Sequence, residues 1–320
     1  MPKLLIIRFS SIGDIVLTSP VLRCIKKQVK DAELHFLTKE QFLPVLQHTP
    51  HIHKIHTIKK EVSEVIPQLR AERFDAVIDL HHNLRTAQVK MKLHAPSSSF
   101  NKLNVKKWLA VRLKWKVLPD VHIVDRYMET VKSLGVVNDN LGLEYFISPA
   151  DEVDVSQLPA AHRKGYIAFA IGAQHYTKRL PTEKIISICK KLDEPVVLLG
   201  GKEDAERGEE IARAVGDKVF NACGKFSLAG SASLVKQAVR VITHDTGLMH
   251  IAAAYKKKIY SVWGNTIPGF GMYPYLPGEG SKIIEVKDLY CRPCSKLGYD
   301  HCPKKHFRCM RDIDEDTFLQ

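Results

Sequence analysis

The chain has 320 residues, of which 45% are hydrophobic and 26% charged, and it carries a formal net charge of +13 at pH 7. No apolar run approaches the roughly 18 residues of a membrane span, and the short opening run is interrupted by Arg8, which excludes a signal-peptide core. Seven cysteines without a secretion signal argue against a disulfide framework, so we expect a cytoplasmic globular protein. The positive charge implies an acidic partner: nucleic acid, an anionic membrane surface or a phosphorylated substrate.

Apolar runs alternate with helical patterns through the first half of the chain. Strands are predicted at residues 3–9, 33–37 and 74–80, helices at 15–27 and 39–47, and a basic helical stretch follows the third strand. This alternation is typical of βαβ units in a parallel sheet. The segment 148–165 lacks periodicity and contains two prolines, so we predict a linker there.

A second alternation follows this linker. Strands are predicted at residues 166–171, 195–199, 219–222, 239–243 and 258–263, with helices such as 182–192 and 204–215 between them. The fold class that we expect is α/β, with two Rossmann-like doubly wound domains facing across a cleft. The predicted domains are residues 1–155 and residues 156–320.

Asp14 directly follows the first predicted strand. The turn Ser10-Ser11-Ile12-Gly13-Asp14 lies where a doubly wound domain exposes the carboxyl edge of its sheet to ligand. It has one glycine and no Gly-Lys-Ser/Thr, so neither the dinucleotide fingerprint nor a P-loop is supported. Asp14 is therefore a candidate general base, and a simple helix N-cap is the alternative.

Two loops of the second half can bind a diphosphate. The loop from Gly172 to Arg179 combines glycine, amide, hydroxyl and two cations, and Lys178 or Arg179 can neutralise a departing nucleotide diphosphate. The segment from Gly200 to Asp204 ends the next strand and allows a close backbone approach to a ligand. The alternative for the first loop is a cation in solvent, and the alternative for the second is an ordinary turn.

The segment 244–254 begins a helix directly after a buried strand. Its free amides and positive helix end predict a phosphate site at Thr246 and Gly247. Asp245 would be repelled by phosphate, so we expect it to accept hydrogen bonds from sugar hydroxyls, with His250 one turn further on the same face. A helix cap and a buried core histidine are the alternatives.

The C-terminal part contains four clustered cysteines. Cys291, Cys294, Cys302 and Cys309 include one C-x-x-C pair, which is compatible with a structural zinc, and reduced packing cysteines are the alternative. In either case we expect this part to be structural and remote from the chemistry. The acidic run at residues 312–316 indicates a solvated patch, so we predict no catalytic metal.

A basic strip occupies residues 80–119, which contain nine Lys or Arg and no Asp or Glu. Trp108 and Trp115 are interleaved with these cations, a pattern that suits an anionic membrane surface or a phosphorylated glycolipid. Nucleic acid is an equally suitable partner for the positive charge of this strip. An ordinary amphipathic helix with a solvated basic face is a further alternative.

Three of these motifs together resemble glycosyltransferase family nine, the ADP-heptose:lipopolysaccharide heptosyltransferases. They are residues 9–16, residues 245–250 and the C-x-x-C pair, and their order matches over nearly the whole chain. The resemblance implies a GT-B fold and an inverting, metal-independent transfer from ADP-L-glycero-D-manno-heptose to a lipopolysaccharide inner-core sugar. It implies that Asp14 is the catalytic base and that Lys178 binds the donor phosphates.

The same resemblance implies the binding residues. Those for the donor are Gly172, Ala173, Gln174, Gly201, Glu203, Phe226, Asp245, Thr246, Gly247 and His250, and those selected for the acceptor are Ser10, Ser11, Gly13 and Arg85. Phe226 falls where the family packs an apolar side chain near the adenosine. The family has paired threonines where this chain has Ala173 and Gln174, and its donor-site glutamate aligns nearest Lys202 or Glu203.

We therefore expect a monomeric enzyme without a cofactor on the inner face of the cytoplasmic membrane. Its partners would be ADP-heptose, a lipid-linked saccharide and the anionic membrane surface, with no nucleic acid. A sugar-nucleotide epimerase of the same fold is one alternative. A basic nucleic-acid-binding protein is another, but it would leave Asp14 and the segment from Asp245 to Gly247 without a role.

Overall fold

The computed structural model describes residues 1–319 and divides into two compact units. The first unit comprises Met1–Lys102 and Val121–Phe146, and the second comprises Leu103–Asp120 and Ile147–Gln320. The division therefore falls nine residues before the predicted one at 155/156, and residues 103–120 pack with the second unit although the sequence placed them in the first domain.

The first unit contains one parallel sheet. Its elements are β1 (Lys3–Ile7), α1 (Ile12–Val16), α2 (Ser19–Gln28), β2 (Glu33–Lys39), β3 (Lys54–Ile58), α3 (Ile66–Glu72), β4 (Ala76–Asp79), α4 (Leu84–Leu93), β5 (Ser97–Ser99) and α6 (Ile123–Met128). The strand order is β3-β2-β1-β4-β5. Because β1 lies between β2 and β4, the chain reverses direction across the sheet at the carboxyl ends of β1 and β4, where such folds bind ligands.

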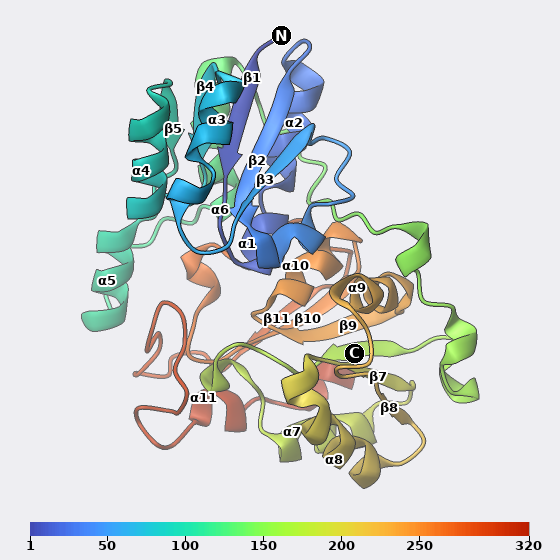
Figure 1. Cartoon of the computed structure of the whole chain (residues 1–320). Helices are drawn as coiled ribbons and strands as arrows, with labels where there is room; N and C mark the ends of the chain where they lie inside the picture. The colour runs from blue at the N-terminus through green and yellow to red at the C-terminus, as the bar shows by residue number, and fades with distance from the viewer. Residues whose placement is uncertain (320) are drawn as a thin grey trace. The chain divides into compact units, whose positions relative to one another are not determined.

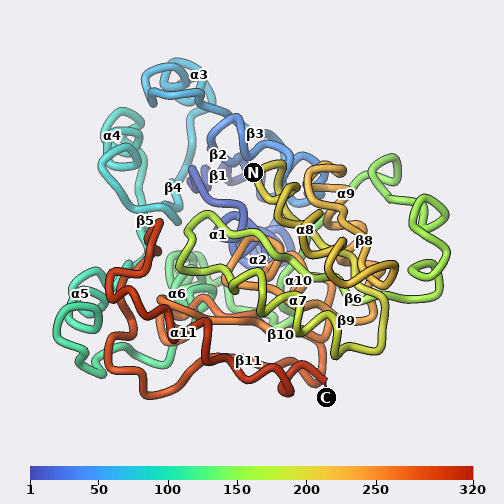
Figure 2. The backbone as a smooth tube through the Cα atoms, turned by 90° about the horizontal axis from the view of Figure 1, so that it is seen from below, coloured from blue at the N-terminus to red at the C-terminus, as the bar shows by residue number. Residues whose placement is uncertain are grey.

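Helices cover both faces of this sheet. Figure 2 shows α3 and α4 on one side of strands β1–β4 and α2 on the other. Leu5 and Leu37 of the sheet form one apolar cluster with Leu69 of α3 and Val89 of α4, and all four are completely buried. Strands buried on both faces are continuously apolar, which is why the sequence predicts β1 and β2 well.

The second unit contains a larger parallel sheet. Its elements are α5 (Asn104–Arg112), β6 (Ile167–Ala170), α7 (Thr182–Lys191), β7 (Val196–Leu199), α8 (Ala205–Val215), β8 (Val219–Asn221), α9 (Leu228–Gln237), β9 (Arg240–His244), α10 (Gly247–Ala254), β10 (Lys258–Trp263), β11 (Lys282–Glu285) and α11 (Arg308–Arg311). The strand order is β11-β10-β9-β6-β7-β8. Figure 1 shows α9 and α10 on one side of this sheet and α7 and α8 on the other.

The reversal point of the second sheet lies between β6 and β9, because β7 and β8 continue on one side and β10 and β11 on the other. The loop after β6 and the start of α10 after β9 therefore meet at one carboxyl edge. These two doubly wound parallel sheets confirm the predicted α/β class.

Prolines change two of the predicted helices. Instead of one helix over 15–27, the chain forms α1 and α2, because Pro20 lacks an amide hydrogen and its ring would collide with the preceding turn. Instead of a helix over 39–47, a 3-10 helix spans Glu40–Val45 with Pro44 inside it. Across residues 1–319, every helix is too short or too polar to cross a lipid bilayer.

Candidate active site

Asp14 lies in the first turn of α1, just beyond the carboxyl end of β1. Its Oδ1 atom is 2.5 Å from Arg8 Nη2, and its Oδ2 atom accepts hydrogen bonds from the Ser11 amide at 3.1 Å and from the Ser11 hydroxyl at 2.8 Å. Arg8 is held in turn by its donation to the carbonyl oxygens of Ser10 and Leu80. The carboxylate therefore has a fixed orientation at the reversal point of the first sheet.

Asp14 is ionised in this environment. Burial alone would raise the pKa of Asp14, but the charge of Arg8 and the hydrogen bonds from Ser11 outweigh burial and hold that pKa below its ordinary value. The side chain keeps 17% of its surface exposed. The carboxylate is thus unprotonated and partly accessible, as a general base must be.

The other predicted acceptor residues lie along the same edge of the sheet. Ser10, Ser11 and Gly13 form the turn that carries Asp14, and Arg85 is exposed in the first turn of α4, after β4. Since β4 pairs with β1, both turns lie at the reversal point.

The sequence did not single out His81, which follows β4 at this edge. Its ring packs edge-on against Phe9 at 5.3 Å between centroids, and within residues 1–319 its buried Nδ1 atom has no hydrogen-bond partner. Burial, followed by the charge of Arg8, lowers the pKa of His81 to about 4, so the ring is neutral. Its signal in the sequence was its position directly after the strand end.

In the second unit, Lys178 and Asp245 form an ion pair. Lys178 Nζ lies 2.6 Å from Asp245 Oδ2, and the Thr266 hydroxyl donates to the same oxygen at 3.0 Å. Both charged side chains are mostly buried, with 16% and 13% of their surface exposed. The structure therefore brings together the predicted phosphate lysine and the predicted sugar-binding aspartate, from the loops after β6 and β9.

The amino end of α10 is open at the same place. Thr246 is the N-cap residue, and its side chain makes no capping hydrogen bond to the helix in the part of the chain that is described. The first amides of α10 are thus available to an anion, and the helix dipole favours negative charge there. The Lys178 ammonium, paired with Asp245, lies on the neighbouring loop after β6.

Buried polar groups fix the loop between β6 and α7. The Leu180 amide donates to His244 Nε2 at 3.0 Å, and Arg207 donates to the carbonyl oxygens of Leu180 and Ile171. Burial, followed by the charge of Arg207, lowers the pKa of His244 to about 3, which keeps Nε2 unprotonated and able to accept. Neither residue was selected from the sequence.

Asp204 connects the loops after β6 and β7. Its buried carboxylate accepts from the Gly201 amide at 3.0 Å and lies so near Gly172 that a Cβ at that position would collide with it. Glycine at position 172 is therefore required by a close approach within the protein. Glu203, the predicted donor residue of this loop, is exposed and folds back over Gly201.

The remaining predicted donor residues differ in accessibility. Gln174 is exposed, Ala173 is partly exposed and accepts a hydrogen bond from Arg179 through its carbonyl oxygen, and Phe226 is partly exposed between β8 and α9. His250 is 2% exposed on α10. Gln174, Ala173 and Phe226 are thus accessible at the carboxyl edge of the sheet, whereas His250 is buried.

The cysteine-containing part is not remote from this site, contrary to the expectation from its position in the sequence. Tyr299 exchanges hydrogen bonds with Thr177, the neighbour of Lys178: its amide donates to Thr177 Oγ1 at 2.8 Å, and its carbonyl oxygen accepts from the Thr177 amide at 3.1 Å. Arg292 donates to the carbonyl oxygens of Trp263, Gly264 and Thr266. This part therefore braces the loop between β6 and α7 and the segment after β10.

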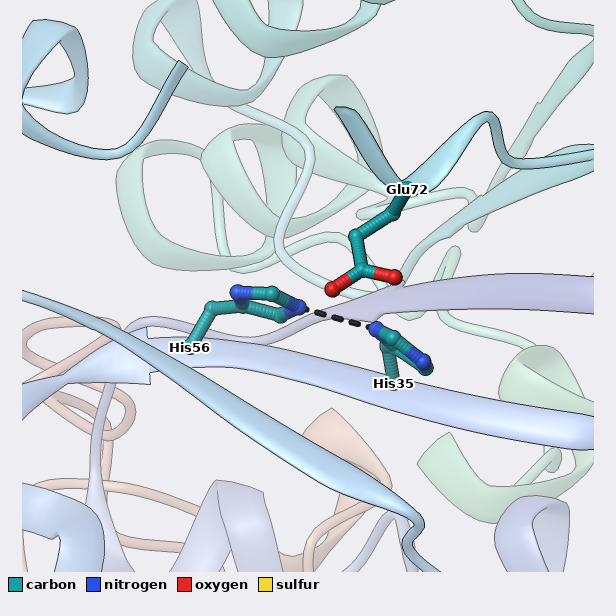
Figure 3. Close-up of side chains that lie close together, drawn as sticks. All are labelled: His35, His56 and Glu72. Atoms are coloured by element: carbon teal, nitrogen blue, oxygen red, sulfur yellow. Dashed lines mark hydrogen bonds between the residues drawn. The ribbon is translucent and has the colours of Figure 1, made fainter. Parts of the chain in front are cut away.

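One group of three metal-capable side chains in residues 1–319 has its ligand atoms within 4.8 Å of one another, namely His35, His56 and Glu72 (Figure 3). His35 Nδ1 lies 2.9 Å from His56 Nε2, and Glu72 accepts hydrogen bonds from Lys3 and Lys54. The two lysines already neutralise the carboxylate, so the group forms a satisfied hydrogen-bond network. The four cysteines form no such group within the described residues.

Comparison with known proteins identifies the family. The model of glycosyltransferase family 9 (heptosyltransferase) matches residues 62–301. The chain belongs to this family, and it is a glycosyltransferase. The matched span begins after Asp14, so the family match itself does not include the candidate base.

Relatives extend over nearly the whole chain. Lipopolysaccharide heptosyltransferase 1 of Campylobacter coli is 25% identical, with 99% of this chain and 97% of the relative covered. Lipopolysaccharide heptosyltransferase 2 of Escherichia coli is 24% identical over 84% of each. The solved family 9 glycosyl transferase of Veillonella parvula has a TM-score of 0.79 at 23% identity, with 99% of this chain and 95% of that chain covered. The predicted family and the GT-B fold are thereby confirmed.

Proposed function

We propose that this glycosyltransferase moves heptose from ADP-L-glycero-D-manno-heptose to an inner-core sugar of lipopolysaccharide, with inversion and without a metal ion. The names of the relatives support the sugar and the acceptor, and a solved Escherichia coli heptosyltransferase with ADP supports the nucleotide. The observation that carries the proposal is the position of Lys178, fixed by Asp245 beside the open amino end of α10.

The donor diphosphate binds at the carboxyl ends of β6 and β9. Lys178 and the amides of Thr246 and Gly247 stabilise the charge that grows on ADP as the bond between the anomeric carbon and the phosphate oxygen breaks. Asp245 keeps Lys178 directed at this place and leaves one carboxylate oxygen for sugar hydroxyls. The open loop residues Ala173, Gln174, Gly201, Glu203 and Phe226 complete the donor site with Gly172 and His250.

The acceptor hydroxyl attacks the anomeric carbon through an oxocarbenium-like state, on the face opposite the leaving ADP. The new carbon–oxygen bond forms as the carbon–phosphate-oxygen bond breaks, and the hydroxyl proton passes to Asp14. Arg8 keeps Asp14 ionised for this step. Ser10, Ser11, Gly13 and Arg85 contribute to acceptor binding from the same edge of the first sheet.

The positive charges of the protein take the place that a divalent cation has in other nucleotide-sugar enzymes. Lys178 supplies a full charge and α10 a partial one, and both lie at the same strand ends. We therefore infer that ADP binding needs no added metal.

We further propose that the enzyme acts as a monomer at the inner face of the cytoplasmic membrane. Val105, Trp108, Leu113 and Trp115 are 45% to 72% exposed, and cations such as Lys106 and Arg112 lie between them. Apolar side chains interleaved with cations suit the surface of anionic lipids, where the acceptor resides.

The proposal is tested by the thermal stability of the protein with ADP, UDP and GDP in the presence of a chelator. A ligand that binds only the folded state raises stability, so we expect ADP to raise the melting temperature most. A strict magnesium requirement or a preference for UDP would contradict the donor assignment. Consumption of ADP-heptose without any acceptor would instead support an epimerase.

A further inference from the structure

The second unit contains a cavity of about 580 Å³ that the proposed reaction has not used. One wall is the end of α5 and the segment after it, including Trp115 and Lys116. The other wall consists of residues after β10 and β11, including Ile267, Lys287 and Tyr290. Trp115 and Tyr290 line the cavity while 55% and 69% exposed, which is unusual for large aromatic side chains.

The segment after β10 links the lining of this cavity to the donor site. The Thr266 hydroxyl donates to Asp245, and the next residue, Ile267, lines the cavity. Arg292, also in the lining, donates to the Thr266 carbonyl oxygen at 3.0 Å. The wall carrying Trp115 is also fixed, because Lys114 Nζ donates to the carbonyl oxygens of Cys291 and Pro293.

The strand order gives the direction in which a bound nucleotide sugar extends. The diphosphate lies at the ends of β6 and β9, and Phe226, the candidate for the nucleoside, follows β8 on one side of it. The cavity follows β10 and β11 on the other side. The nucleoside and the cavity are thus on opposite sides of the phosphates, and the cavity is on the side available to the sugar; this step rests on the proposed function.

We propose that this cavity binds a saccharide unit of the acceptor. The faces of Trp115 and Tyr290 provide flat apolar surfaces against which the carbon–hydrogen face of a pyranose packs, as aromatic side chains do in ligand sites. Lys116 and Lys287 provide donors for carboxylate or phosphate substituents, and Asp288 accepts from hydroxyls. An acyl chain would leave these charged groups against apolar surface at a large cost in solvation, so a saccharide fits better.

The direct test is the binding of deacylated, heptose-free lipopolysaccharide saccharide to the protein without donor, measured by calorimetry. We expect Trp115→Ala to weaken binding by about tenfold or more, Trp115→Phe to retain most of it, and Tyr290→Ala to weaken it similarly. Trp108→Ala is the matched control, because Trp108 is 52% exposed on the same segment but does not line the cavity.

Saccharide binding within twofold of the parent protein in both Trp115→Ala and Tyr290→Ala would overturn the proposal. So would a loss of ADP affinity in Trp115→Ala, which would assign the cavity to the nucleoside, or binding of the acylated glycolipid alone, which would assign it to an acyl chain. ADP binding and transfer by the parent protein are measured separately, so a failure of the proposed function is distinguished from a failure of this site.

Discussion

Lys178 Nζ and Asp245 Oδ2 lie 2.6 Å apart in a mostly buried setting at the carboxyl edge of the second sheet. The two residues come from separate loops, and Thr266 holds the same carboxylate oxygen from a third. Asp245 therefore orients Lys178, the residue proposed to bind the donor phosphates. This relationship makes the effect of changing either residue dependent on the other.

Lys178→Ala is expected to weaken ADP binding by about 10- to 100-fold, because it removes a charged partner of the diphosphate and leaves the Asp245 carboxylate to repel it. Adding Asp245→Asn should recover part of the lost affinity by removing the repulsion. Calorimetric titration with ADP measures both. Lys236→Ala, at an exposed lysine paired with Glu152, is the control. Equal affinities in the single and double variants would show that the pair does not act at the diphosphate.

Thr177→Val tests whether the cysteine-containing part braces the loop between β6 and α7. Valine retains the shape of threonine but leaves the Tyr299 amide without its acceptor, so the free energy of unfolding should fall by about 1–3 kcal/mol. ADP affinity should fall with it. Tyr299→Phe keeps both backbone contacts and should have a much smaller effect in urea unfolding. Unchanged stability and ADP affinity in Thr177→Val would show that the contact does not brace the loop.

The central strands of both sheets were predictable because they are buried on both faces and appear as continuous apolar runs. The edge strands β3, β5 and β11 were not predicted. Their sequences, KIHTI, SSS and KIIE, are polar or short, and each strand pairs on one side only, so it lacks the continuous apolar run of a central strand. The break between α1 and α2 had a visible signal in Pro20, which marks the start of the second helix.

The sequence identifies the loops of the candidate site but not the contacts between the side chains of those loops. Position after a strand end selected Asp14, Lys178 and Asp245, because ligands bind at the carboxyl ends of parallel strands. The pairing of Lys178 with Asp245 and the support of the loop by His244 depend on strand order, which the sequence leaves open. His244 opens the segment 244–254 but was given no role there, yet its ring accepts a hydrogen bond from the Leu180 amide.

His56 should make the protein less stable in mild acid. Burial, followed by the charge of His35, lowers the pKa of His56 from 6.5 to about 4, so the folded protein binds fewer protons than the unfolded chain between these values. The free energy of unfolding is therefore not reduced by His56 above about pH 6.5, and it decreases as the pH falls towards 4. Urea unfolding at several pH values should show a weaker pH dependence for His56→Gln than for the parent. An identical pH dependence would contradict the assignment.

Membrane association is expected to depend on the exposed cations of α5. Lys106→Glu with Arg112→Glu should weaken binding to vesicles rich in anionic lipid, since each cation near such a surface contributes about 1 kcal/mol. Binding by the parent protein should also decrease with added salt. Lys30→Glu with Lys236→Glu changes the net charge equally at exposed positions elsewhere. Equal losses in both double variants would assign the attraction to net charge alone.

Asp14→Asn tests the central claim most directly, because it replaces the proposed base with an amide of nearly the same size that cannot accept the acceptor's proton. Release of ADP from ADP-heptose in the presence of acceptor measures transfer, and circular dichroism and ADP titration establish that the variant is folded and binds donor. We predict a fall in transfer of roughly 100-fold or more with ADP affinity near that of the parent protein. Asp31→Asn, the same exchange at an exposed aspartate outside the proposed site, should retain full activity. A folded, ADP-binding Asp14→Asn variant that transfers heptose at close to the parental rate would contradict the account.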